Sequence, residues 1–307
     1  MLRHALVLTA GLGTRLQPLT SVRAKPAIPV AGEPLIRRII TWLSAQGVTE
    51  TVLNLHHLPH TLTAVVGDGS DLGVRVRYSW EQPVVLGSAG GPRHALPMIG
   101  SDTFFLINGD TMTDLDLQAL ALAHDASGAL ITMALVPNRE PHKYGGVLTA
   151  ADGAVTGFVR PGADAAGSSH LIGVQIAHAD AFRALQDGQA VNSTGDAYLQ
   201  LLASRPGCIR AYPCDAAFQD IGTASDYWST SFACLGDRPP EQAYGRRVRI
   251  GRGARITRSI LWDDVEVGAD AAIEECLVTD RAQIPAGSVY RRSVLRQGEH
   301  GLLVTPL

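Results

Sequence analysis

Charged residues are scarce in this sequence, and long apolar runs are missing from it. Charged residues make up 18% of the 307 residues, and the formal net charge is only -3. So small a charge gives the whole protein no attraction to nucleic acid or to an anionic membrane, and any anionic ligand must be held locally. No stretch of about 18 apolar residues occurs, which argues against a transmembrane helix. We therefore expect neither a nucleic-acid partner nor a membrane partner.

Cysteine is also rare. The four cysteines, Cys208, Cys214, Cys234 and Cys276, form no CxxC pair and no zinc-ligand spacing, so reduced thiols are expected. The apolar run at residues 5–8 is too short for the core of a signal peptide. These features predict a cytoplasmic protein.

The pattern of apolar residues predicts an α/β sheet. A helical spacing of apolar residues over 34–46, ended by Gly47, lies between the first two strand-like runs and gives a strand-helix-strand unit. Such units favour parallel strands, and ligands of open α/β sheets bind at the carboxyl ends of those strands. The predicted strands are His4 to Leu8, Thr51 to Leu55, Val74 to Tyr78, Thr103 to Ile107 and Ala129 to Val136.

The composition changes after the Pro239-Pro240 pair. Ile250, Ile256 and Trp262 follow a six-residue step, Val267 falls one residue short, and Ile273 and Ile284 continue the series beside several glycines. A six-residue step is typical of a hexapeptide parallel β-helix, for which the segment has room for about two coils. A few irregular strands are the alternative. We place the domain boundary between residues 238 and 239.

A glycine-rich loop follows the first predicted strand. Gly11 and Gly13 would let backbone N–H groups approach a phosphate, and Arg15 adds a guanidinium. The loop lacks the third glycine of a dinucleotide-binding fingerprint and the GK[ST] of a Walker loop. Lys25, in a proline-rich segment ten residues later, supplies a second cation. A tight turn and a solvated lysine are the purely structural interpretations.

Two carboxylates stand at the ends of apolar segments. Asp110 closes the sequence Asn108-Gly109-Asp110 after a predicted strand, and Asp220 follows Phe218 and Gln219. Magnesium commonly takes one or two protein carboxylates together with substrate phosphates. The structural alternatives are an Asn-Gly hairpin turn for Asp110 and a helix cap for Asp220.

Together these segments resemble the sugar nucleotidyltransferase family, the NDP-sugar pyrophosphorylases, over essentially the whole chain. GLGTRLQPLT at 11–20 and KPAIPVAGEPLI at 25–36 look like the family's signature loop and lysine segment. LGSAGG at 86–91, NGD at 108–110 and DIGT at 220–223 fall in the family's order. The C-terminal repeats are similar to the tail of mannose-1-phosphate guanylyltransferases and related glucose-1-phosphate enzymes.

The resemblance implies a fold, a reaction and a set of site residues. The fold would be a Rossmann-like, GT-A-like mixed sheet flanked by helices over residues 1–238, with a short left-handed parallel β-helix over 239–307. The reaction would join a nucleoside triphosphate to a sugar 1-phosphate with Mg²⁺ as cofactor, in a homo-oligomer. The implied catalytic residues are Arg15, Lys25 and Asp110, and the metal ligands are Asp110 and Asp220. The implied nucleotide-binding residues are Ala10, Gly11, Gly13, Thr14, Gln82, Gly87 and Asn108, and the sugar-phosphate-binding residues are Tyr144, Gly145, Arg160 and Gly173.

The sequence departs from the family pattern where the sugar would bind. Arg160 stands where the family has a lysine, and the acidic residue that accompanies that lysine is absent. The family's Asn-Ala-Gly step reads Leu171-Ile172-Gly173, after His170, for which a surface loop position is the structural interpretation.

The best match in function is a guanylyltransferase that makes GDP-mannose from GTP and mannose 1-phosphate. The alternatives are a UTP- or dTTP-dependent glucose-1-phosphate or N-acetylmuramate-1-phosphate nucleotidyltransferase, and a non-catalytic regulatory subunit that binds nucleotide sugar. Because every proposed catalytic residue precedes residue 239, we expect the tail to serve stability or self-association.

Overall fold

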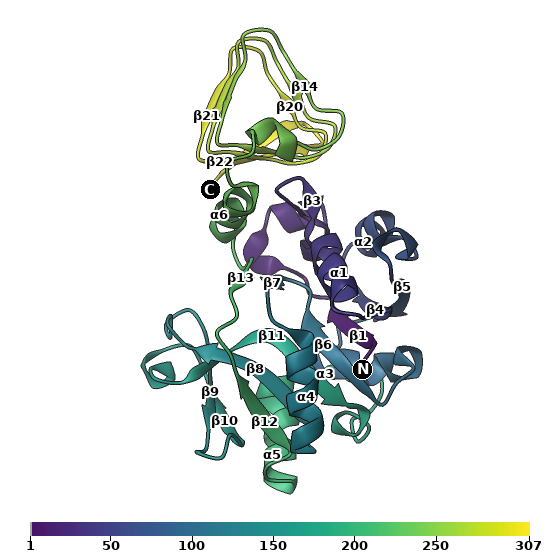
Figure 1. Ribbon diagram of the computed structural model, residues 1–307. Coiled ribbons are helices and arrows are strands. Elements are labelled where there is room, and N and C mark those ends of the chain that lie inside the picture. The colour runs from purple at the N-terminus through teal and green to yellow at the C-terminus, as the bar shows by residue number, and fades with distance from the viewer. Residues whose placement is uncertain (1) are drawn as a thin grey trace. The chain divides into compact units, whose positions relative to one another are not determined.

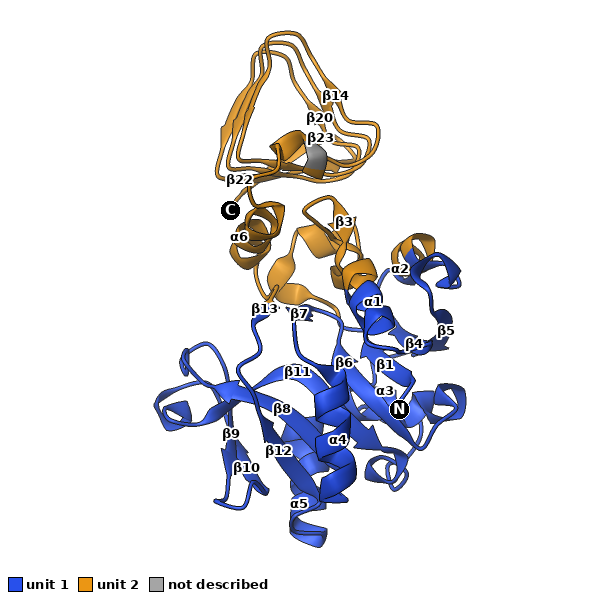
Figure 2. Ribbon diagram, in the orientation of Figure 1, with its two compact units in different colours: residues 1–11, 39–59, 66–219 blue, residues 12–38, 60–65, 220–307 orange. Residues whose placement is uncertain are grey.

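The computed structural model describes residues 2–307, apart from the side chain of Gln242, and divides into two compact units (Figure 2). Unit 1 comprises Met1–Gly11, Ile39–Pro59 and Val66–Gln219, and unit 2 comprises Leu12–Arg38, His60–Val65 and Asp220–Leu307. The boundary predicted between residues 238 and 239 lies inside unit 2 and stays a prediction.

Unit 1 is built on a mixed nine-stranded sheet, as far as the described residues go (Figure 1). Strands β5, β4, β1 and β6 run parallel in that order, and β11 adds antiparallel to β6. Strands β8 and β9 pair with β11, and β12 and β10 pair with β8 and β9 respectively. The strands are β1 (His4–Leu8), β4 (Glu50–Leu55), β5 (Arg75–Trp80), β6 (Thr103–Asn108), β8 (Ile131–Pro137), β9 (Gly146–Thr149), β10 (Val155–Val159), β11 (Ser169–His178) and β12 (Ile209–Pro213).

The predicted α/β pattern is confirmed. The predicted helix over 34–46 is α1 (Leu35–Ala45), and all five predicted strands are present to within about two residues at each end. Helix α3 (Gly87–Ile99) packs on the parallel strands, while α4 (Leu117–Ser127) packs on β8, β11 and β12. The other helices are α2 (Pro59–Val66), α5 (Tyr198–Ser204) and α6 (Ala224–Leu235), and a short hairpin joins β2 (Pro29–Val30) to β3 (Glu33–Pro34).

The parallel order places the ends of β1 and β6 side by side. Leu8, the last residue of β1, is paired with Asn108, the last residue of β6. The glycine-rich segment after β1 and the Asn108-Gly109-Asp110 segment after β6 therefore leave the sheet at the same edge. This is the edge at which open α/β sheets bind ligands.

The C-terminal part of unit 2 is a three-sided parallel β-helix, seen end-on as a triangular coil in Figure 1. Each side is a ladder of three parallel strands, and a last strand pairs antiparallel with β22. The strands are β14 (Arg249–Ile250), β17 (Glu266–Val267) and β20 (Gln283–Ile284); β15 (Arg255–Thr257), β18 (Ala272–Glu274) and β21 (Val289–Arg291); β16 (Ile260–Leu261), β19 (Leu277–Val278) and β22 (Ser293–Gly298), with β23 (Gly301–Pro306).

The coils are more numerous, and their period is shorter, than the sequence predicted. Each ladder has three strands rather than the two expected, and Arg249 pairs with Glu266 and Glu266 with Gln283, a step of 17 residues. Three steps of six would need 18, so one side of each coil has a five-residue step. Leu261 therefore takes the core position predicted for Trp262. This shorter side also explains why Val267 fell one residue short of a strict step of six.

Neighbouring coils approach closely at small residues. A Cβ on Gly251 would lie 2.5 Å from the backbone nitrogen of Ala269, and one on Gly268 would lie 2.5 Å from that of Ala286. A side chain at either position would force two coils apart. These glycines are therefore required by the stacking of the coils.

Candidate functional site

In unit 2, the loop after β1 folds back on itself around Gly13. This glycine has a left-handed φ of 62°, and its carbonyl accepts hydrogen bonds from Leu16 N (2.9 Å) and Thr20 Oγ1 (2.9 Å). A Cβ on Gly13 would lie 2.7 Å from Thr20 Cγ2 and 3.3 Å from Lys25 Cβ. Only glycine fits there, and the packing brings the Gly13 backbone and Lys25 together.

Arg15 and Asp220 also lie close to one another, against Gly222. A Cβ on Gly222 would be 3.2 Å from Arg15 Nη1 and 3.4 Å from Asp220 Oδ2. The next residue, Thr223, begins α6 with a capping box: Asp226 N donates to Thr223 Oγ1 (3.1 Å), and Thr223 N donates to Asp226 Oδ2 (2.9 Å). The cap of α6 is thus Thr223, and the structural alternative for Asp220, a helix cap, does not apply.

In unit 1, the edge of the sheet holds Asp110 in a tight turn. Gly109 N donates to the Leu8 carbonyl (3.0 Å), and a Cβ on Gly109 would lie 2.5 Å from that oxygen. The short strand β7 (Thr111–Thr113) follows Asp110 and pairs with β13 (Phe218–Asp220). The Asn-Gly pair is therefore no hairpin turn between paired strands. Asp110 precedes one strand of this ladder directly, and Asp220 is the last residue of the other.

A buried carboxylate fixes the segment that carries the predicted nucleotide-binding residues Gln82 and Gly87, and no sequence motif indicated it. Glu81 accepts hydrogen bonds from Asn54 Nδ2 (2.7 Å) and from Leu86 N (2.7 Å). Gly87 follows with a φ of 77°, and a Cβ there would lie 2.7 Å from the Val191 carbonyl oxygen. Glu81 thus ties the ends of the segment that carries Gln82, which is exposed, while Gly87 admits no side chain.

Other predicted nucleotide-binding residues lie at the same edge of the sheet. Thr9 N donates to Asn54 Oδ1 (2.6 Å), which holds the chain just before buried Ala10 and exposed Gly11. Asn108 contacts Gly173, where φ is 76° and a Cβ would lie 2.9 Å from Asn108 Cβ. The predicted nucleotide residue Asn108 and the predicted sugar residue Gly173 are therefore neighbours.

The predicted sugar-binding residue Tyr144 belongs to a cluster of three rings that no sequence pattern indicated. Its ring centroid lies 4.2 Å from that of His170, and the ring of Phe218 lies 5.2 Å from His170 and 5.8 Å from Tyr144. His170 is half-buried in β11, not in a surface loop. Burial is the main cause that lowers the pKa of His170, against a hydrogen bond with the Gly145 backbone, so this ring is neutral near neutral pH. The three rings come from segments far apart in the sequence, so their contact could not be predicted from it.

Arg160 follows a residue, Val159, that packs against Gly145, the neighbour of Tyr144 in unit 1. Gly145 packs against the segment that leads into Arg160, because a Cβ on Gly145 would lie 2.9 Å from the Val159 carbonyl oxygen. The side chain of Arg160 is exposed. Its guanidinium is therefore available to an anion without displacing packed groups.

A closed metal site is absent from the described part of the chain, where no three or more His, Cys, Asp or Glu side chains could share an ion. All four cysteines are free thiols. Among the helices of residues 2–307, none has the length and apolar character needed to cross a membrane. A metal that acts here would therefore need ligands from the substrate as well as carboxylates such as Asp110 and Asp220.

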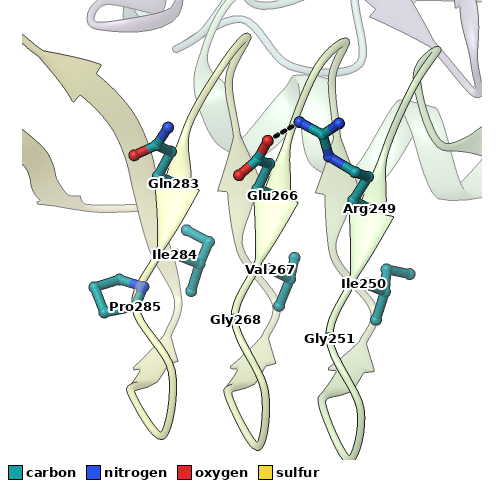
Figure 3. A pocket seen from close by; sticks show the side chains of 9 residues that line it. All are labelled: Arg249, Ile250, Gly251, Glu266, Val267, Gly268, Gln283, Ile284 and Pro285. Carbon is teal, nitrogen blue, oxygen red and sulfur yellow. Dashed lines mark hydrogen bonds and ion pairs between the residues drawn. The ribbon is translucent and has the colours of Figure 1, made fainter.

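The β-helix carries a shallow hollow of about 530 Å³ on the side formed by β14, β17 and β20 (Figure 3). Gly251 and Gly268 contribute no side chains to it, and an ion pair between Arg249 and Glu266 runs across neighbouring coils. None of the predicted site residues lines this hollow. We therefore do not assign this hollow to the predicted nucleotidyl-transfer site.

Comparison with known proteins identifies the family. The model of the family described as "Nucleotidyl transferase" matches residues 4–235. The mannose-1-phosphate guanylyltransferase of Mycobacterium tuberculosis is 28% identical over 297 residues, covering 88% of this chain and 82% of that protein. The UTP–glucose-1-phosphate uridylyltransferase of Synechocystis sp. is 30% identical over 278 residues, covering 86% of this chain and 71% of that protein.

A solved structure supports the same fold. The crystal structure of HddC from Yersinia pseudotuberculosis superposes with a TM-score of 0.64 at 23% identity, covering 74% of this chain and 97% of that one. A second structure of that protein is complexed with GMP-PN. Because the family match extends over residues 4–235, which is most of the chain, this chain belongs to the nucleotidyl transferase family and is a sugar-1-phosphate nucleotidyltransferase.

Proposed function

We propose that the chain makes GDP-mannose and pyrophosphate from GTP and mannose 1-phosphate. The choice rests on two sequence features taken together. The C-terminal repeats resemble the tail of mannose-1-phosphate guanylyltransferases and related glucose-1-phosphate enzymes, and the LGSAGG segment at 86–91 looks most like the guanylyltransferases. The extent of the match supports it, since 82% of the guanylyltransferase relative is covered against 71% of the uridylyltransferase.

The reaction requires no general base. A sugar 1-phosphate is largely dianionic at neutral pH, because a phosphate monoester has a second pKa of about 6. One of its oxygens attacks the α-phosphorus of the nucleotide, a new P–O bond forms, and the bond to the bridging oxygen of the β-phosphate breaks to release pyrophosphate. The protein must align two anions and stabilise the charge that develops on the leaving group.

Cationic residues on the loop after β1 serve that second task. Arg15 binds the β- and γ-phosphates, and Lys25 contacts the reacting phosphates. Neither has to be moved at the moment of reaction, because the fold around Gly13 fixes the loop beforehand. Preorganised charge of this kind is the main source of rate in phosphoryl transfer.

Asp110 and Asp220 fit the role of Mg²⁺ ligands. Two carboxylates, with the remaining positions left to water and substrate phosphates, are the usual protein contribution to a magnesium site. Asp110 directly precedes β7 and Asp220 is the last residue of β13, so the backbone limits the movement of each. The bound ion would supply charge neutralisation at the triphosphate.

The remaining residues bind the two substrates. Backbone groups of the glycine-rich loop and of the segment tied by Glu81 hold the nucleotide, and the ring cluster of Tyr144 adjoins the sugar. The proposed nucleotide residues are Ala10, Gly11, Gly13, Thr14, Gln82, Gly87 and Asn108, and the proposed sugar-phosphate residues are Tyr144, Gly145, Arg160 and Gly173.

The alternative is a uridylyl- or thymidylyltransferase that acts on glucose 1-phosphate or N-acetylmuramate 1-phosphate. The similarity to the Synechocystis uridylyltransferase favours it. A matrix of GTP, UTP, dTTP, ATP and CTP against these sugar 1-phosphates, read by pyrophosphate release, separates the two. We expect the highest kcat/KM for GTP with mannose 1-phosphate. A higher value for UTP or dTTP with another sugar would overturn the assignment of substrates.

A further inference from the structure

An arginine of the substrate-binding loop is held by the β-helix. Arg23 lies between Arg15 and Lys25, and its guanidinium donates two hydrogen bonds to Asp280, from Nε to Oδ2 (2.7 Å) and from Nη2 to Oδ1 (2.6 Å). Nη2 also lies 3.0 Å from Asp263 Oδ2. All these residues belong to unit 2.

The ion pairs of Arg23 with Asp263 and Asp280 are buried, and both Arg23 and Asp280 make further contacts. The three side chains are only 11%, 16% and 15% exposed for Arg23, Asp263 and Asp280. Asp280 Oδ1 also accepts from the backbone N of Asp263 (3.0 Å), which ties one coil to the next. The guanidinium carbon lies 5.2 Å from the ring centroid of Trp262, in a cation–π contact.

A second connection runs from the same tryptophan to the other end of the loop. Trp262 Nε1 donates to the hydroxyl of Tyr227 (2.9 Å), and that hydroxyl donates to the carbonyl of Pro29 (2.6 Å). Arg23 and Pro29 bracket Lys25. The segment that carries Lys25 is therefore fixed on both sides by residues that contact the β-helix directly or through one side chain.

Such a contact constrains the position of the loop. A bidentate guanidinium–carboxylate pair has one favourable geometry, and a buried pair that loses one partner leaves an uncompensated charge. Other hydrogen bonds also hold the loop: Gly13 with Thr20 shapes it locally, and Ala24 N donates to Thr61 Oγ1 (3.0 Å) in α2. The Arg23 pair is the direct ionic contact between the loop and the β-helix. Displacements of about 1 Å can cost a catalytic group about 100-fold in rate.

We propose that Asp263 and Asp280 of the β-helix are positioning residues for nucleotidyl transfer, because they fix Arg23 and with it the loop that carries Arg15 and Lys25. This inference rests on the proposed roles of Arg15 and Lys25. It adds a further role to the expectation that the tail serves stability or self-association. The tail follows all the proposed catalytic residues in the sequence. It nevertheless contacts Arg23, in the segment between Arg15 and Lys25.

The test uses point variants of the full chain. Asp280→Asn keeps the size of the side chain and removes its charge, and Asp264→Asn is the matched control. Asp264 pairs with Arg247 within the β-helix (2.5 Å), but that pair is exposed and does not involve the loop. Steady-state kinetics with each substrate varied separately, and thermal unfolding, are measured for both variants.

For Asp280→Asn we expect the KM for the nucleoside triphosphate to rise by at least about ten-fold, with the KM for the sugar 1-phosphate within about two-fold of wild type. A merely structural residue would lower the active fraction and leave both KM values unchanged. Arg23→Gln should have the same effect as Asp280→Asn, and the double variant no larger one, since the two side chains act as a unit. If Asp280→Asn does not fold, Arg23→Lys tests the same contact, because it keeps the charge and loses the two-pronged geometry.

Kinetic constants for Asp280→Asn and Arg23→Gln equal to those of Asp264→Asn would overturn the inference. Arg15→Ala distinguishes this from a failure of the proposed site. If Arg15→Ala loses activity while the Arg23 and Asp280 variants keep it, the positioning role is wrong and the site stands. If Arg15→Ala is fully active, the proposed roles of the loop residues are wrong, and the positioning role fails with them.

Discussion

Removing a single hydroxyl, with Tyr227→Phe, should destabilise unit 2 strongly. The Tyr227 side chain is completely buried, and its oxygen both donates to the Pro29 carbonyl and accepts from Trp262 Nε1. Phenylalanine fills the same space without either hydrogen bond, so one buried acceptor and one buried donor lose their partner. Each such loss costs about 1–3 kcal/mol, which gives about 2–6 kcal/mol in all.

Hydrogen exchange measured by mass spectrometry is the appropriate assay, because the two units need not unfold together. Peptides from residues 12–38 and 220–307 should lose protection by that amount in Tyr227→Phe, while peptides from the sheet of unit 1 serve as the internal reference. Tyr78→Phe is the matched control: its hydroxyl donates one hydrogen bond, to the Gly67 carbonyl (2.6 Å), near solvent. The control should change protection by less than about 1 kcal/mol. A loss in Tyr227→Phe no larger than that of the control would refute the reasoning.

Three further predictions follow from the site and the core. Burial is the main cause that lowers the pKa of His124 below 6.5 in the folded state, so the unfolded chain binds the proton more tightly and stability is lost as pH falls through 6.5. Urea midpoints at pH 7.5 and 5.5 should differ more for wild type than for His124→Asn, and equal differences would contradict this. Excess chelator should abolish turnover, and Asp110→Asn should lower kcat at least about 100-fold in a folded protein, whereas normal turnover of either sample would remove the metal assignment. Arg160→Ala should raise the KM for the sugar 1-phosphate about ten- to a hundred-fold and leave the nucleotide KM nearly unchanged. Arg160→Lys should recover part of the loss. An unchanged KM for the sugar 1-phosphate would show that Arg160 does not bind it.

The elements of the sheet were predictable because their signals are local. A strand such as β1 is a short run of buried apolar residues, and α1 shows its buried face at helical spacing, so neither depends on distant parts of the chain. The β-helix was predictable in kind for the same reason. Its 17-residue coil was harder to read, since Leu261 and Trp262 are adjacent and both are buried. Their contacts distinguish them: Leu261 packs in the β-helix core, whereas Trp262 contacts Tyr227 and Arg23.

The contacts that join distant segments could not be predicted. Arg23 and Asp280 are 257 residues apart, and each taken alone is an ordinary surface charge in the sequence. Glu81 and the rings around His170 are similar cases, because their partners come from other strands and helices. The individual residues of the candidate site were suggested by family motifs, whereas the groups that hold them in place depend on tertiary structure.

The central claim is that an oxygen of the sugar phosphate attacks the nucleotide at its α-phosphorus. It is tested most directly by ³¹P NMR of the reaction with a sugar 1-phosphate whose phosphate oxygens carry ¹⁸O, using the best substrate pair from the matrix. The account predicts that all the label is found in the nucleotide sugar, with one ¹⁸O in the bridge between its two phosphorus atoms, and that the pyrophosphate is unlabelled. Label in the pyrophosphate, or pyrophosphate released without the sugar 1-phosphate, would contradict it.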